Sequence, residues 1–200
     1  MKKATKAIVI ALCAVLLVAG SVMGTLAWLT STASVKNTFT VGKVAITLDE
    51  KNIDGKDALG NPSSAERDTA NEYGLMPGVT YTKDPTIHIE AGSEACWLFV
   101  KIENGISAIE STDKSIASQM AANWTVIDEA KGIYKYNTKV AKSNTQTDII
   151  VFSTFTVKDS ATSTELEAVK NNTIQVTAYA VQADGLDSAE KAWQASGFGA

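Results

Sequence analysis

The stretch Ala95-Cys96-Trp97-Leu98-Phe99-Val100-Lys101-Ile102 is apolar at almost every position. In an extended strand successive side chains point to opposite faces, so Cys96 shares a face with Leu98, Val100 and Ile102. The opposite face is largely apolar as well, which is typical of a strand covered on both sides. We therefore predict a central β-strand with Cys96 buried as a small hydrophobic residue; the alternative is a reactive or intermolecular thiol.

Other segments of the chain have strand patterning too. Residues 39–50 alternate, with Val44, Ile46 and Leu48 on one face, and Met76-Pro77-Gly78 is a turn signal. Residues 173–183 alternate in the same way, and residues 51–74 read as a long polar loop. The remaining strands are expected at 79–90, 95–103, 124–128, 133–140 and 147–158.

Helical signals are few and short. A helix is expected near 65–70, another within 106–122 and a third at 164–170. At the C-terminus, Asp187 and Glu190 have capping-box spacing and would begin a helix that packs Trp193 inward. Seven or eight mostly antiparallel strands predict an all-β fold, a two-sheet antiparallel jelly-roll-type sandwich, although strand number alone also allows an immunoglobulin-like sandwich.

The N-terminus has the composition of an export signal. Lysines at positions 2, 3 and 6 precede an uncharged apolar run over 7–23 that continues to Ala27. Cleavage is expected between Ala27 and Trp28, giving a signal peptide 1–27, an extended segment 28–40 and a sandwich domain 41–200. Alternatively the run stays as an uncleaved anchor, because its length approaches a bilayer span. Either way the protein is expected to be secreted or held at the cell surface.

Charge narrows the choice of partners. Residues 1–27 contain three lysines and no acidic residue, so the rest of the chain has 15 Lys and Arg against 22 Asp and Glu, a net charge of −7. Nucleic acids and anionic membranes require basic patches, so neither is expected as a partner. Cys96 is the one cysteine outside the signal region, which excludes an intramolecular disulfide after cleavage.

Catalytic and metal-binding patterns are weak. The chain has one histidine, His88, which alternation places on the polar face of its strand and which we expect to face solvent. The paired-histidine helix of zinc peptidases, the nucleophile elbow of hydrolases and phosphate-binding glycine loops are absent from the sequence. We therefore predict no enzymatic activity and no cofactor. Asp49, Asp54 and Asp57 are weak calcium candidates, and a solvated polar loop is the alternative.

Four segments together resemble one family. They are Gly24-Thr25-Leu26-Ala27-Trp28-Leu29-Thr30 with Asn37-Thr38-Phe39-Thr40-Val41-Gly42-Lys43-Val44, then Leu75-Met76-Pro77-Gly78 with Lys83-Asp84-Pro85 and Ile87-His88-Ile89-Glu90-Ala91-Gly92, then Trp97-Leu98-Phe99-Val100-Lys101-Ile102, and last Ala178-Tyr179-Ala180-Val181-Gln182-Ala183-Asp184-Gly185. In this order, behind this signal, they resemble the TasA/camelysin family of SipW-dependent exported proteins, and its BsaA-like matrix proteins. The resemblance implies a jelly-roll protein of Gram-positive bacteria that polymerises into biofilm matrix fibres.

The segment 28–40 is the expected means of polymerisation. It is rich in Thr, Ser and Val, lacks Pro and Gly, and carries one charge. Inserted into a neighbouring sheet as a donor strand, it would be anchored by Trp28, Leu29, Val35 and Phe39. It could instead be a lead-in, or the first strand of its own sheet. The expected partners are other copies of this chain, other matrix proteins and, during export, the signal peptidase. The alternatives are a surface-anchored, adhesin-like binding module and a camelysin-like secreted metallopeptidase.

Overall fold

The computed structural model describes residues 3–29, 42–57 and 59–198. The chain separates into two compact units, Met1–Val41 and Gly42–Ala200. In the first unit, α1 (Lys3–Leu29) is a continuous helix. Within the described ranges, no helix combines the length and the apolar character that crossing a membrane requires.

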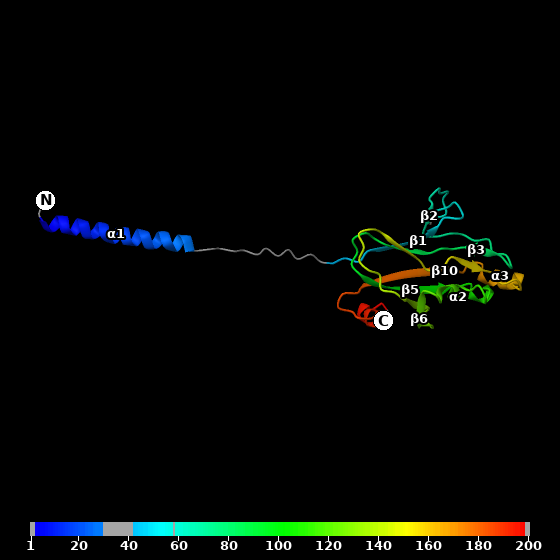
Figure 1. Ribbon diagram of the computed structural model, residues 1–200. Helices are drawn as coiled ribbons and strands as arrows, with labels where there is room; N and C mark the ends of the chain where they lie inside the picture. Colours follow the sequence, from blue (N-terminus) through cyan, green and yellow to red (C-terminus); the bar gives the residue numbers. More distant parts are fainter. Residues whose placement is uncertain (1–2, 30–41, 58, 199–200) are drawn as a thin grey trace. The chain divides into compact units, whose positions relative to one another are not determined.

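The second unit is built mainly of short antiparallel strands, with a few short helices between them (Figure 1). The described strands are β1 (Ile46–Lys51), β2 (Arg67–Asp68), β3 (Thr80–Thr82), β4 (Thr86–Ile89), β5 (Cys96–Asn104), β6 (Trp124–Asp128), β7 (Ile133–Tyr136), β8 (Thr147–Ile150), β9 (Thr154–Thr156) and β10 (Ile174–Gln182). The described helices of this unit are η1 (Ser107–Ile109), α2 (Ile116–Met120), α3 (Ser163–Val169) and α4 (Ala189–Ser196).

The strands form two four-stranded sheets, ordered β2-β1-β4-β8 and β10-β5-β7-β6, and a two-stranded sheet of β3 and β9. Every pairing between described strands is antiparallel. The expectation of a mostly β fold with antiparallel sheets and a few short helices is therefore confirmed. The finer assignment to the jelly-roll type stays a prediction.

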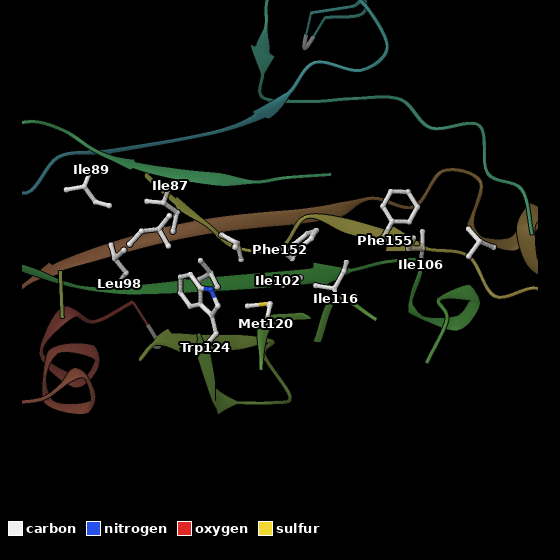
Figure 2. Packing of buried hydrophobic residues seen from close by; sticks show 14 of the residues in the cluster. Ile87, Ile89, Leu98, Ile102, Ile106, Ile116, Met120, Trp124, Phe152 and Phe155 are labelled. Atoms are coloured by element: carbon white, nitrogen blue, oxygen red, sulfur yellow. The ribbon is translucent and has the colours of Figure 1, made fainter. Parts of the chain in front are cut away.

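The two four-stranded sheets share one hydrophobic core. Figure 2 shows Ile87 and Ile89 of β4 together with Leu98 and Ile102 of β5 in this core. Cys96 is fully buried beside them, and burial raises the pKa of its thiol to about 11. The predicted buried environment of this cysteine is thus confirmed.

The other face of β5 is covered as well. Phe99 is fully buried there, and its ring lies 4.9 Å, centroid to centroid, from that of Trp193 on α4. On β10 the two faces divide in the same way, since Val176 packs on the main core and Tyr179 packs on the α4 side. The prediction that β5 is covered on both faces, with Trp193 packed inward, is confirmed.

Two predicted long strands are each divided in two. The predicted strand 79–90 is β3 followed by β4, and 147–158 is β8 followed by β9. The register of β3 with β9 continues that of β4 with β8. The interruption contains Pro85, which has no N–H for a ladder and only accepts a hydrogen bond, from Val151.

Two local predictions are wrong. The helix near 65–70 is absent, because Glu66 accepts a backbone hydrogen bond from Asn52 and β2 pairs there with β1. The cap of α4 is Ser188, whose hydroxyl accepts from the N–H of Lys191, and the neighbouring Asp187 pairs with the Lys191 ammonium instead. The helix over 164–170 is confirmed as α3, which begins with a capping box.

The Pro77-Gly78 turn is confirmed. Gly78 has φ +74°, a left-handed conformation that glycine adopts without strain, and the N–H of Val79 donates to Met76. Proline followed by such a glycine is the sequence of a type II turn. This turn leads the chain into β3.

Candidate functional site

A groove of about 880 Å³ lies between β1 and β10. It is bordered by Leu48, Asp49 and Glu50 on the β1 side and by Ile174, Gln175 and Val176 on the β10 side. Apolar side chains make up much of its lining; they include Leu75, Ile106, Phe155 and Val169. A largely apolar groove between two sheets suits an extended peptide segment.

The strand β10 presents a free backbone edge beside this groove. Among the described strands it pairs only with β5, in a ladder flanked by hydrogen bonds from Gly105 to Thr173 and from Ala183 to Ala95. Bonded and non-bonded pairs alternate in an antiparallel ladder, so the odd-numbered residues of β10 bond to β5. The even-numbered residues therefore turn their N–H and C=O groups outward; these are Ile174, Val176, Ala178, Ala180 and Gln182.

The strand β1 presents a second backbone edge. The N–H of Glu90 donates to Ala45, which makes the odd-numbered residues of β1 the ones bonded to β4. Ile46 and Leu48 therefore direct their backbone groups away from β4, whereas Glu50 pairs with β2. Within the described strands, nothing pairs with β1 at Ile46 and Leu48, so the groove lies between two incomplete edges.

A buried ion pair lies in the groove. The Lys83 ammonium donates to Glu50 at 2.6 Å, and the two residues are 9% and 5% exposed. Asn71 donates to the other carboxylate oxygen of Glu50 at 3.1 Å. The Lys83 ammonium lies over the Tyr73 ring, and its nitrogen is 6.0 Å from the ring centroid. Each charge thus has compensating contacts, as a buried ion pair requires.

The outer face of the β2-β1-β4-β8 sheet carries a different polar cluster. Arg67 donates to Asp49, to Asp84 at 3.3 Å and to the hydroxyl of Thr86 at 2.8 Å. His88 lies next to them, and its side chain is only 12% exposed. We define these residues and Asp148 as the outer cluster. The expectation that His88 faces solvent is wrong, because neighbouring strands supply carboxylates on both sides of its ring.

His88 joins three strands of that sheet. Its Nε2 lies 2.9 Å from Asp49 of β1, and its Nδ1 lies 2.7 Å from Asp148 of β8. Burial lowers the pKa of the imidazole, but the hydrogen bonds to Asp49 and Asp148 outweigh it and the pKa is raised. Burial by itself raises the pKa of Asp49, but hydrogen bonds from Arg67 and His88 bring it below its ordinary value. When it is protonated, the ring donates to carboxylates on both sides and links β4 to β1 and β8.

The residues predicted for cleavage and polymerisation lie outside the second unit. Ala27, Trp28 and Leu29 form the C-terminal end of α1. Val35 and Phe39 lie outside the described residues, and so does most of the segment 28–40. Their predicted roles stay predictions.

The three calcium candidates each have protein partners. Asp49 belongs to the outer cluster, Asp54 accepts N–H groups from Lys56 and Glu72, and Asp57 accepts those of Leu59 and Asn61. Over the described ranges, no three His, Cys, Asp or Glu side chains are grouped so that they could hold a metal ion. Asp54 and Asp57 order the loop by accepting hydrogen bonds from its backbone.

The roles of the polar residues in the groove and in the outer cluster were not predicted from the sequence. Glu50 continues the alternation of Ile46 and Leu48, so the pattern placed it on the apolar face, where an acidic side chain needs a partner. Arg67 is the only arginine in the chain, as His88 is the only histidine. Their separation of 21 residues concealed that β1 brings both to the same carboxylate.

Comparison with known proteins gives no relative. No family model, no curated protein and no solved structure matches this chain.

Proposed function

We propose that this protein is an exported structural subunit of extracellular biofilm matrix fibres. Subunits would join head-to-tail, each inserting residues 28–40 into the groove between β1 and β10 of the next. The observation that carries the proposal is the free edge of β10, nine residues long, whose first residues Ile174–Val176 border a groove with apolar side chains in its lining. Such an edge is a template for another strand.

Strand addition at β10 would complete both the sheet and the core. An incoming strand can hydrogen-bond to the outward-facing residues of β10, each bond contributing about 0.5–1.5 kcal/mol net. Its alternate side chains would cover the partly buried Leu48, Leu75 and Val176. Apolar burial contributes roughly 25 cal/mol per Å², so a few anchors stabilise the joint substantially.

The segment 28–40 has the right length and composition for this role. Thirteen extended residues span roughly 40 Å, and nine residues of β10 span roughly 30 Å, at about 3.3 Å per residue. Trp28, Leu29, Val35 and Phe39 are its apolar anchors. The absence of Pro and Gly allows an uninterrupted ladder.

The position of Gly42–Ala45 favours insertion into a neighbour over the same subunit. The carbonyl of Lys43 accepts from Glu94, and the carbonyl of Ala45 accepts from Glu90. These contacts place the start of the unit near the Ile46 end of β1, whereas the groove lies at the Glu50 end. A segment from the same chain would have to reverse direction to fill it. Insertion into the next subunit is head-to-tail and yields open filaments.

The proposal includes the steps before and around assembly. The signal peptidase would cleave between Ala27 and Trp28, and the released protein would carry a jelly-roll-type domain outside the cell. Its partners would be identical subunits and other matrix proteins. We assign it no catalytic activity and no cofactor, and its role would rest on backbone pairing and on burial of the apolar anchors.

Electron microscopy of purified 28–200 beside 41–200, after concentration, tests the proposal. We expect fibres from 28–200 and none from 41–200, because the shorter chain lacks the donor segment. Circular dichroism of both chains verifies that each is folded.

Each other outcome has a definite meaning. Fibres from both chains would keep the matrix role and contradict strand insertion. If neither chain formed fibres, the surface-anchored, adhesin-like module would become the better account. An N-terminus at Met1 in the exported protein would support that reading as well.

A further inference from the structure

The groove contains one buried charged pair. Few polar side chains of the described ranges are buried, and of these Glu50 and Lys83 line the groove. A buried ion pair is a costly feature, since an apolar pair of similar volume is often as stable or more stable. Pairs of this kind are best attested where they select one register or partner.

The donor segment has a matching pattern. In an extended strand its odd-numbered residues would share one face, which includes Leu29, Ala33, Val35 and Phe39 and leaves the anchor Trp28 on the opposite face. Asn37 is on the same face, between Val35 and Phe39. If those two anchors are buried in the groove, the amide of Asn37 is buried with them and needs hydrogen-bond partners.

We infer that the Glu50–Lys83 pair fixes the register of the incoming strand by receiving the side-chain amide of Asn37 from the neighbouring subunit. This inference rests on the proposed function, because it needs strand insertion. It adds a residue that specifies how far the strand advances.

The chemistry of an amide suits an ion pair. The Asn37 carbonyl can accept from the Lys83 ammonium, which has three donors and gives one to Glu50. The Asn37 NH₂ group can donate to the carboxylate. A neutral amide satisfies both members and leaves the pair intact, whereas an added charge would unbalance it.

The same contact penalises slipped registers. A shift by one residue turns the polar face of the segment inward. A shift by two residues keeps the apolar face inward but puts Val35 or Phe39 against the ion pair and Asn37 against apolar lining. A buried amide without partners is unfavourable, so the correct register is selected.

A double-mutant cycle on fibre assembly tests this inference. The donor change is Asn37→Val and the acceptor change is Glu50→Met with Lys83→Met, which replaces the pair by apolar side chains of similar length. The critical concentration for fibre formation is measured for 28–200, for each change and for both together. Urea unfolding of the same changes in 41–200 verifies that the acceptor domain is folded.

We expect matched combinations to assemble and mismatched ones to assemble poorly. The donor change alone should raise the critical concentration by about tenfold, and so should the acceptor change alone, in which both methionines are present. About tenfold is the effect of one unsatisfied buried polar group. Combining them should restore it to within about threefold of the parent chain. Ser31→Val, on the same face of the segment, is the matched control and should show no coupling to the acceptor change.

Additive effects in the cycle would overturn the inference. So would fibres of Asn37→Val with an unchanged critical concentration; in both cases strand insertion itself would stand. Absence of fibres from the parent 28–200 chain would instead remove the proposed function, and this inference with it.

Discussion

The two edges of the β10-β5-β7-β6 sheet differ sharply. The edge strand β6 has five residues, ends in Asp128 and has a register shift between Val126 and Asp128. The opposite edge strand, β10, has nine residues, no charge, no proline and no register shift. Soluble proteins commonly protect sheet edges with short strands, charges and bulges, so β6 is a protected edge and β10 is not.

This difference indicates which edge an incoming strand would pair with. An unprotected edge is a liability for a monomer, since it promotes pairing with any extended chain. Here the same edge adjoins a groove of about 880 Å³ with a buried ion pair in it. Under the proposed strand insertion the groove would make the pairing selective, because an arriving segment would have to satisfy the ion pair as well as the edge.

Proline substitutions at the two edges give the largest predicted effect. Ala178→Pro removes an outward N–H from β10 without removing a hydrogen bond to β5. Val126→Pro is its counterpart, because Val126 also directs its backbone groups away from the neighbouring strand, β7. We expect Ala178→Pro in 28–200 to abolish fibres and Val126→Pro to leave them, as seen by electron microscopy.

The folded state of both proline variants serves as the control. Thermal melting of the same substitutions in 41–200 should show two folded domains with similar midpoints. Fibres from a folded Ala178→Pro chain would show that β10 is not the docking edge.

A second comparison concerns the buried ion pair of the groove and a more exposed pair between β7 and α4. Lys83 pairs with Glu50 in the groove, with side chains 10% and 6% exposed, whereas Lys135 of β7 pairs with Glu190 of α4 at the surface. Lys83→Met leaves a buried carboxylate uncompensated and should cost about 3–5 kcal/mol of unfolding free energy. Lys135→Met should cost about 0–1 kcal/mol.

Urea unfolding of 41–200 measures both changes without interference from assembly. Equal losses from the two substitutions would contradict the effect expected from the deeper burial of the Glu50–Lys83 pair. Glu50→Met with Lys83→Met should recover most of the loss, because neither charge is then left unpaired.

The strands that bear the site could be predicted from sequence because their apolar patterns are strong. The two-sided apolar run of β5 and the alternation of β10 each encode burial locally. Strand ends are harder to predict. The predicted strand 133–140 ends at Tyr136 in the structure, and Val140 makes only an isolated bridge to Cys96. Such boundaries depend on partners distant in sequence.

The polar contacts of the site could be predicted less well. By alternation Glu50 falls on the face of Ile46 and Leu48, yet its partner Lys83 is 33 residues away, in the link between β3 and β4. Alternation along its strand predicts that the His88 side chain faces solvent. In the structure, carboxylates from β1 and β8 cover that side chain. A strand pattern gives the face of a residue, whereas its neighbours across the sheet follow only from register.

The smallest predicted effect concerns the pH dependence of the β1 wall of the groove. The folded-state pKa of His88 is raised, so its stabilising contribution is complete below the unfolded value of about 6.5 and is lost as pH rises through the raised pKa. The pKa values of Asp49 and Asp148 are lowered, so their contributions are lost only as pH falls through those lowered values. Arg67, which also donates to Asp84, keeps its charge across the neutral range, because its pKa is raised further above an already high ordinary value.

Urea unfolding of 41–200 between pH 5 and pH 9, beside His88→Gln, measures this contribution. We expect the parent chain to lose about 1–2 kcal/mol across this range, the contribution of a hydrogen bond between charged groups in a partly buried site. His88→Gln should be less stable at pH 5 and should lack the loss, because glutamine has no titrating proton. His88 is the only histidine in the chain, so no second imidazole can mask the difference. Parallel pH profiles for the two chains would contradict the role of His88 in holding β1, β4 and β8 together, and the β1 wall would then depend on Arg67 alone.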